Sequence, residues 1–292
     1  MRVILPRQFE AHQLFPFIKA NFGKFESIPA EINFDLSQLS FVWPSGIVFL
    51  SNLSHFLHRC GCRVTYGGTR NNTAAVRFLD DSLFFQQHTG SKLNSHCSPR
   101  STTQPLVQIK HANAHGWIEL TLIPWLAKCS GVPISELAEF STCVKEIFNN
   151  IRDHTEFDVG CVFAQWYPNV NRLMIAVADF GAGIPKTVRR VAPHLTDDQA
   201  ILKAFDDGFS SRSTPQNRGA GLFYLRQNVV ENLGGSLTVR SLEGAVGFRK
   251  SGNSFTTVPY STQGYCPGTL IEVEIRTDRL EFEPFQGGNF EW

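Results

Sequence analysis

The chain has 292 residues, of which 42% are hydrophobic and 12% aromatic, and its 27 basic residues nearly balance its 26 acidic residues. This composition excludes a chain dominated by disorder, and a net charge of +1 argues against a dedicated nucleic-acid-binding protein. The length is sufficient for two compact domains.

No segment is apolar over the roughly 20 residues that a membrane-spanning helix requires. The longest apolar run, residues 41–50, is interrupted by Pro44, Ser45 and Gly46, and the N-terminus lacks the apolar core of a signal peptide. We therefore expect a cytoplasmic protein without a membrane-spanning segment, whose seven cysteines are reduced thiols.

The first hundred residues predict a small α/β unit. Strand-like alternation over residues 31–36 is followed by helical spacing of apolar residues over 46–59. A second strand at 63–66 and a second helix at 74–85 complete a strand–helix–strand–helix order. The polar segment 89–104 is typical of a linker, so we place a domain boundary near it.

The second part of the chain predicts a larger set of strands with several helices. A long amphipathic helix is expected from a cap at Ser135, because Leu137, Phe140 and Val144 recur at steps of three and four residues. The other expected elements are strands at 106–110, 117–122, 159–166, 172–178, 236–241 and 269–275, and helices at 200–209 and 222–233.

The long helix carries the first candidate site residues. Glu146, Asn150 and His154 are four residues apart and therefore share one helical face. The amide oxygen of Asn150 is a suitable ligand for Mg²⁺, and the carboxylate of Glu146 can orient or deprotonate a water or hydroxyl. Taken alone, this spacing is more typical of a solvated helix face.

A second motif joins the end of an apolar strand to a glycine-rich turn. Asp179 is followed by Gly181 and Gly183, and Pro185 comes next. Glycine lets a backbone turn tightly and lets a flat ligand approach, while a carboxylate at a strand end can accept a hydrogen bond from an exocyclic amine such as that of adenine. An ordinary strand-to-loop turn is the structural alternative.

A third motif opens a helix with Arg218, Gly219 and Gly221. Glycines at the start of a helix leave backbone N–H groups free to bind phosphate oxygens, and Arg218 can add a charged contact. By itself the motif is weak, because such turns are as often structural.

In this order and spacing, the three motifs together resemble the GHKL ATP-binding fold, which gyrase, heat-shock chaperone, histidine-kinase and mismatch-repair ATPases share. Glu146 and Asn150 resemble its N box, residues 179–183 its first glycine box and residues 219–221 its second. The resemblance extends over residues 106–276.

Two further segments contribute to this resemblance. Residues 185–217 fall where the family has its ATP lid, and Gly268 and Thr269 resemble the late Gly-Thr pair on the strand behind the adenine. The fold class implied is α/β, a two-layer α/β sandwich of the GHKL type.

The resemblance implies a role for each of these residues with ATP and Mg²⁺ as cofactors. At the adenine, Asp179 would bind the amine, Gly181 and Gly183 would lie against the base, and Thr269 would contribute through a water molecule.

At the phosphates, the family implies a second set of roles. Asn150 would coordinate the Mg²⁺ that bridges the phosphates, and Glu146 would be the general base. Gly219 and Gly221, together with Arg218, would contact the phosphates as the lid closes.

Within the family, the residue type at the position of Glu146 differs between functional groups. Histidine kinases usually carry asparagine at this position, whereas glutamate suits water activation in ATPases. Glutamate also suits hydroxyl activation in the Ser/Thr kinases that act as anti-sigma factors, and Glu146, Asn150 and His154 together look most like the N box of that group. The segment at 185–217 is longer than in those compact kinases.

The N-terminal unit is similar to a STAS-like domain, the kind of protein that anti-sigma kinases phosphorylate on a Ser or Thr before a glycine. Ser45 stands at that position, although Trp43 and Pro44 replace the usual Asp-Ser pair. The alternative is that Ser45 only caps the helix that begins at Gly46.

We therefore expect three parts: a STAS-like α/β domain at 1–100, a GHKL ATP-binding domain at 101–280 and a C-terminal tail at 281–292. The expected function is Mg-dependent ATP hydrolysis, gated by a lid and coupled to the control of a protein partner. A Ser/Thr protein kinase of the anti-sigma type and a nucleotide-sensing module without turnover are the alternatives, and homodimer formation stays open.

Overall fold

The computed structural model describes residues 1–154, 159–209, 221–251, 254–259 and 264–279. Its largest element is a seven-stranded antiparallel sheet with the order β11–β10–β9–β12–β8–β7–β6. The strands are β6 (Thr103–Lys110), β7 (Val159–Tyr167), β8 (Arg172–Asp179), β9 (Ser236–Leu242), β10 (Gly244–Ser251), β11 (Ser254–Pro259) and β12 (Cys266–Arg276).

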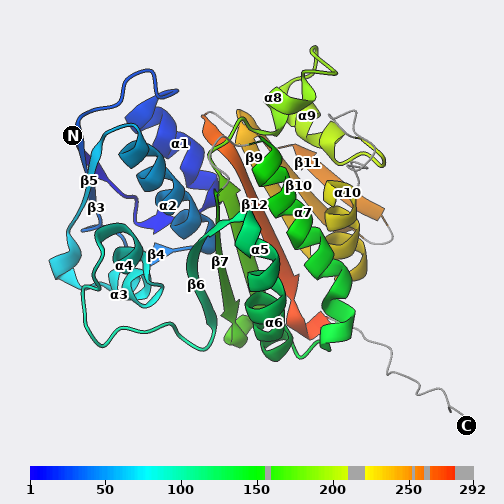
Figure 1. Cartoon of the computed structure of the whole chain (residues 1–292), viewed down its shortest axis with the longest axis horizontal. Helices are drawn as coiled ribbons and strands as arrows, with labels where there is room; N and C mark the ends of the chain where they lie inside the picture. The colour runs from blue at the N-terminus through cyan, green and yellow to red at the C-terminus, as the bar shows by residue number, and fades with distance from the viewer. Residues whose placement is uncertain (155–158, 210–220, 252–253, 260–263, 280–292) are drawn as a thin grey trace, which may run out of the picture.

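Helices cover one face of this sheet, which we call the front face (Figure 1). They are α5 (His111–Trp117), η2 (Ile118–Leu122), α6 (Ile123–Ser130), η3 (Ile134–Leu137), α7 (Ala138–His154), α8 (Ile184–Val188), α9 (Asp197–Ala204), α10 (Gly221–Arg226) and η5 (Gln227–Asn232). Side chains alternate along each strand. Leu173, Ile175 and Val177 of β8 therefore join the helix-covered core, while Ala176 and Ala178 face the other way.

Short 3₁₀ turns at Pro168–Val170 (η4) and Thr277–Arg279 (η6) follow strands β7 and β12. The helix-covered sheet is the α/β sandwich architecture that the sequence predicted.

The N-terminal unit, residues 1–100, contains a small parallel sheet with the order β1–β3–β5 and a two-stranded pair β2–β4. Its strands are β1 (Arg2–Ile4), β2 (Gln8–Phe9), β3 (Glu31–Asp35), β4 (Phe41–Val42) and β5 (Arg63–Gly67). Its helices are α1 (Ala11–Phe22), α2 (Pro44–Arg59), η1 (Thr69–Asn71), α3 (Ala74–Asp81) and α4 (Phe84–Thr89).

This unit packs on the back face of the large sheet, opposite the helices. Helix α2 lies against β7 and β8, where the strands present the small side chains of Cys161, Ala176 and Ala178. Small side chains let a helix approach a sheet closely, and one continuous hydrophobic cluster includes residues of both units. The N-terminal unit therefore shares a core with the sheet that carries the candidate site.

Most predicted elements are present near their expected positions. The strand at 31–36, the helix at 46–59, the strand at 63–66 and the hairpin at 159–178 correspond to β3, α2, β5 and the pair β7–β8. The strands at 106–110, 236–241 and 269–275 correspond to β6, β9 and β12. These segments have strong periodicity, which is the most reliable local signal.

The strand predicted at 117–122 is wrong, because these residues belong to one continuous run of helix from α5 to α6. The alternation around Glu119 matched a strand, which would place Leu120 on the same face as Ile118 and Leu122. Leu120 is 81% exposed, whereas Ile118 and Leu122 are fully buried. The spacing of four residues between Ile118 and Leu122 is therefore the helical one. On the exposed side of this helix, Glu119 forms an ion pair with Lys145 of α7.

Other boundaries also differ from the prediction. The helix expected at 74–85 is split by Leu83, whose φ of 64° interrupts it between α3 and α4. The helix expected at 200–209 occupies 197–204, and its N-cap Thr196 forms a capping box with Gln199. Strands β10 and β11 were not predicted.

Ser45 does not cap α2. The N-cap is Trp43, Pro44 follows at the first helical position, and Ser45 lies inside the helix with no exposed surface. Ser45 lines a cavity of about 710 Å³ between the N-terminal unit and the back face, together with Arg240 and Glu272. Its hydroxyl is therefore inaccessible to another enzyme while the two units are packed together.

No described helix combines the length and the low polarity that crossing a bilayer requires.

Candidate functional site

Asp179 is the last residue of β8, whose preceding residues are almost all buried apolar side chains. The strand carries the carboxyl group to the edge of the core, where Asp179 is only 8% exposed. The backbone N–H of Gly181 donates a hydrogen bond of 2.6 Å to its Oδ1. Among the described residues this is the only hydrogen bond that its carboxyl group accepts.

Burial raises the pKa of the Asp179 carboxyl group to about 7, although the N–H of Gly181 opposes this shift. Such a shift is expected where a carboxylate loses water without gaining a positive partner. A ligand that donates a hydrogen bond to Asp179 would stabilise the ionised carboxylate and so offset the cost of its burial. A buried acid with this property in a glycine-rich turn is a candidate binding residue.

Gly268 and Thr269 of β12 lie directly beside Asp179. Thr269 is its antiparallel partner in the register of β8 and β12, and it is 9% exposed. Gly268 has a φ of +72°, and a Cβ atom there would be 2.1 Å from the backbone oxygen of Asp179. Only glycine permits this conformation without strain and this close approach of the two strands.

Ser241, at the end of β9, joins the loops around Asp179 and was not predicted as a site residue. Its Oγ donates to the backbone oxygen of Gly268 at 2.6 Å and accepts from the N–H of Ile184 at 3.0 Å. It also lies 3.3 Å from Oγ1 of Thr269. No spacing rule marks a serine at the end of a strand, so only the packing of three distant segments shows its position.

Gly183 packs against the same serine. Its φ is +81°, and a Cβ atom there would be 2.8 Å from Oγ of Ser241 and 3.1 Å from the backbone oxygen of Gly268. Asp179, Gly181, Gly183 and Thr269 are therefore brought together as the sequence predicted, and we call this group with Ser241 the carboxylate end of the site.

Glu146 and Gly221 meet on the front face, where α7 packs against α10. A Cβ atom at Gly221 would be 1.7 Å from Cγ of Glu146, so any larger residue would displace the glutamate. Asn149 donates a hydrogen bond of 3.1 Å to Oε2 of Glu146. We call Glu146 and Gly221 the helix end of the site.

An apolar cluster connects the two ends. Ile184 follows Gly183, Leu222 follows Gly221, and both side chains pack against Val188, Ala200 and Ala204 of α8 and α9. The two glycine motifs, separated by almost forty residues in the chain, therefore share one set of packing contacts.

Three predicted residues lie wholly or partly outside the described part of the structure. Arg218 and Gly219 are outside it, and so is the end of the segment at 185–217, from residue 210 on. Asn150 belongs to α7, one turn after Glu146, but its side chain is outside the described part of the structure.

Residues 137–262 match the family model described as "Histidine kinase-, DNA gyrase B-, and HSP90-like ATPase". No curated protein sequence matches the chain. The matched span contains Glu146, Asp179, Gly221 and Ser241, whereas Thr269 follows it. Residues 137–262 are therefore similar to the ATPase domains of histidine kinases, DNA gyrase B and HSP90, and this similarity supports the binding of ATP.

Proposed function

We propose that this protein binds ATP with Mg²⁺ and hydrolyses it, and that the nucleotide state controls a protein partner. The single observation that carries the proposal is the buried carboxyl group of Asp179 at the end of β8, whose Oδ1 accepts a hydrogen bond from the N–H of Gly181. Together with the family match of residues 137–262, this favours a purine amine as the group that Asp179 recognises.

At the carboxylate end, each residue contributes to recognition of the base. Asp179 accepts the hydrogen bond of the adenine amine, and the ionised carboxylate is the stronger acceptor. Gly181 and Gly183 lie against the ring because they carry no side chain there. Thr269, beside Asp179 in the sheet, supports the base through a water molecule.

At the helix end, Glu146 is the proposed general base and Gly221 contributes a backbone N–H for the phosphates. Asn150, one helical turn from Glu146, would hold Mg²⁺, an ion that neutralises phosphate charge and prefers oxygen ligands. Gly219 and Arg218 are proposed as further phosphate contacts within the lid.

The proposed reaction is ordinary ATP hydrolysis. Glu146 takes a proton from a water molecule, whose oxygen forms a bond to the γ-phosphorus. The bond from the γ-phosphorus to the bridging oxygen breaks, and ADP leaves with that electron pair. A serine hydroxyl in place of water would give a phosphoprotein by the same proton transfer.

The proposal also includes the domain organisation. It divides the chain at residue 100 into a STAS-like unit and an ATP-binding domain, and it treats residues 281–292 as a tail. The parallel strands β1, β3 and β5 with helix α2 between the last two are compatible with a small α/β domain of that kind. The N-terminal unit covers the back face of the large sheet and shares a hydrophobic cluster with it. A protein partner would therefore contact other surfaces.

Incubation of the full chain with Mg²⁺ and γ-labelled ATP tests the proposal. Free labelled phosphate supports hydrolysis, and label on a protein serine supports the kinase alternative. Tight binding without either product supports a nucleotide-sensing module. Absence of any affinity for adenine nucleotides in the presence of Mg²⁺ contradicts the proposal as a whole.

A further inference from the structure

The residue between Asp179 and Gly181 points away from the carboxylate end and into the N-terminal unit. The ring of Phe180 lies 5.7 Å from that of Phe49 and 5.6 Å from that of Phe56, measured between centroids. Both partners belong to α2. These separations are within the range of favourable aromatic contacts.

The aromatic contacts continue beyond α2. The ring of Phe56 lies 5.2 Å from that of Phe25, and Phe25 stacks on Phe22 at 5.3 Å. Phe180 is thus attached to the interior of the N-terminal unit rather than to its surface alone.

The backbone of Phe180 lies close to β12. A Cβ atom at Gly268 would be 2.6 Å from Cα of Phe180. The ring therefore packs on α2 while the backbone lies beside β12, so Phe180 contacts both units.

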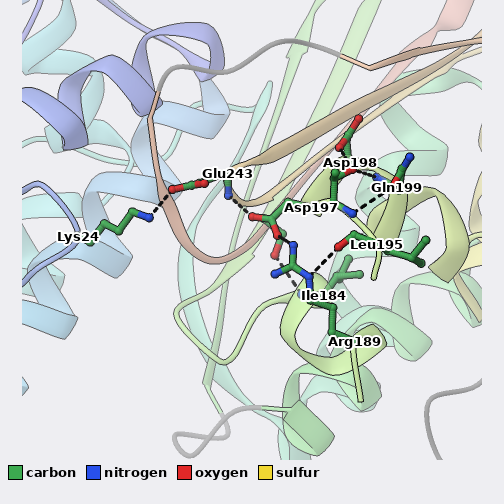
Figure 2. A network of polar contacts seen from close by, with 10 residues as sticks. Lys24, Ile184, Arg189, Leu195, Asp197, Asp198, Gln199 and Glu243 are labelled. Atoms are coloured by element: carbon green, nitrogen blue, oxygen red, sulfur yellow. Dashed lines mark hydrogen bonds and ion pairs between the residues drawn. The ribbon is translucent and has the colours of Figure 1, made fainter. Parts of the chain in front are cut away.

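A second link joins the N-terminal unit to the segment that follows Gly183 (Figure 2). Lys24, just after α1, pairs with Glu243 at 2.5 Å, and the backbone N–H of Glu243 donates to Oδ2 of Asp197 at 2.7 Å. Asp197 also pairs with Arg189, the residue after α8. Since Lys24 and Glu243 are both more than half exposed, this link is weaker than the packing of Phe180.

We propose that α2 of the N-terminal unit positions the Asp179 loop through Phe180, so that high-affinity ATP binding requires the two units to be packed together. Phe180 is in this view a positioning residue. The inference rests on the proposed function, in which Asp179 binds the adenine. The physical reason is that a loop with two glycines has many conformations, and an attached side chain restricts them before the ligand arrives.

The consequence is that the N-terminal unit can regulate the ATP site. Any event that separates α2 from the back face frees Phe180 and with it the loop of Asp179. Conversely, ATP binding favours the packed arrangement to the same extent, because coupling between two binding equilibria is reciprocal.

The test uses the full chain and compares four variants: Phe180→Ala, Phe56→Ala, Phe180→Leu and Phe84→Leu. Phe84 is fully buried in the N-terminal unit, and its ring contacts are Tyr66, Phe85 and His88 rather than Phe180. Its substitution therefore controls for loss of stability. Binding of ATP in the presence of Mg²⁺ is measured by calorimetry, and unfolding by urea is measured in parallel.

We expect Phe180→Ala and Phe56→Ala each to weaken ATP binding about 10-fold, the equivalent of about one or two lost aromatic contacts. Phe180→Leu should keep most of the affinity for ATP, because leucine still fills the space against α2. Phe84→Leu should lower stability and leave the affinity unchanged. Unchanged affinity in both alanine variants, or an equal loss in Phe84→Leu, would overturn the inference.

A second measurement does not depend on ATP. The amide of Gly181, which donates to Asp179, should exchange hydrogen faster in Phe56→Ala than in Phe84→Leu, both without nucleotide. Equal exchange in these two variants also overturns the inference. If the unchanged chain fails to bind ATP, the proposed function is wrong, whereas ATP binding that is insensitive to Phe180 removes only the positioning role.

Discussion

The two ends of the candidate site are built in different ways. At the carboxylate end, strand ends and backbone groups meet: Gly268 lies close against the backbone of Asp179, and Ser241 bonds to the backbone oxygen of Gly268. At the helix end, a long side chain, Glu146, lies across the glycine of a neighbouring helix. The first arrangement suits recognition of a rigid flat group, and the second suits a side chain that has to transfer a proton.

Because the two ends differ in this way, we expect substitutions to affect ATP binding and ATP turnover separately. Changes at the carboxylate end are expected to alter affinity and stability together, because the carboxylate is buried in the same group of packed loops that the Ser241 hydrogen bonds join. Changes at the helix end are expected to alter turnover while affinity stays close to its original value.

The largest effect is expected for Glu146→Gln. Removal of a general base lowers turnover about 10²–10⁴-fold, while the affinity for ATP changes little. The measurement is phosphate release at saturating ATP together with calorimetric binding. Glu139→Gln is the matched control, because Glu139 lies on the same helix and accepts a hydrogen bond from Asn228. Equal turnover in the two variants would contradict the assignment of the base.

Asp179→Asn should weaken ATP binding about 10- to 100-fold, because the strong acceptor of the adenine amine is replaced by an amide of about the same size. Calorimetric titration with ATP and with GTP checks this, since the loss should be specific for the adenine base. An affinity for ATP equal to that of the unchanged chain would remove Asp179 from the site.

The same residue predicts a pH dependence of stability without nucleotide. The pKa of Asp179 is near 7 in the folded protein, above its ordinary value of 3.8, so the folded state binds more protons than the unfolded state between these values. The free energy of unfolding should therefore fall by up to about 1.4 kcal/mol per pH unit as the pH rises from 4 to 7.

Urea unfolding of the unchanged chain and of Asp179→Asn at several pH values isolates this contribution. The free energy of unfolding of the asparagine variant, relative to that of the unchanged chain, should increase as the pH rises towards 7 and become constant above pH 7. A difference that is independent of pH would show that Asp179 is not the group responsible.

Gly221→Ala tests the contact between the two helices. The added methyl group occupies the space of the Glu146 side chain, which has to turn away. We expect turnover to fall about 10-fold through misplacement of the base, with a smaller change in affinity. Gly131→Ala serves as a control for introduction of alanine at a glycine with open space around it, although its φ of +76° adds some strain.

The smallest effect is expected for Ser241→Ala. The substitution removes the hydrogen bonds to Gly268 and Ile184, at a cost of about 1–3 kcal/mol if these buried groups stay unpaired. ATP affinity should fall only a few-fold, since the carboxylate itself remains. Ser236→Ala on the same strand is the matched control, and a loss of affinity in it equal to that in Ser241→Ala would argue against a role of Ser241 at the site.

Local patterns predicted a large part of the fold. Strands β7, β8, β9 and β12 and the amphipathic helix α7 follow from alternation or from steps of three and four residues. The failure at residues 117–122 has a clear cause, since a short apolar pattern fits both periods until the exposed position of Leu120 decides between them. Strands β10 and β11 were not predicted; β10 pairs with β9, and β11 pairs with β10 at the edge of the sheet.

The candidate site shows a similar limit. Motif spacing predicted Asp179, Gly183 and Glu146 as site residues, because glycines and carboxylates in this combination and at these positions are typical of a binding site. The positions of Ser241 and Phe180 were not predicted, since a serine near the end of a strand and an aromatic residue beside an aspartate are common in any protein. Their positions are set by contacts with residues far away in the chain, since Ser241 binds the N–H of Ile184 and Phe180 packs on Phe49.

Local sequence patterns establish the α/β character of the chain and the order of most of its elements, and they predict the residue types of the candidate site, because backbone conformation and glycine chemistry are local. Only the packing of distant segments shows that α2 lies on the back face, that Phe180 packs on α2 and that Ser241 joins two loops. These contacts depend on which surfaces bury each other when the chain collapses, and pairwise packing over long distances leaves no periodic trace in the sequence.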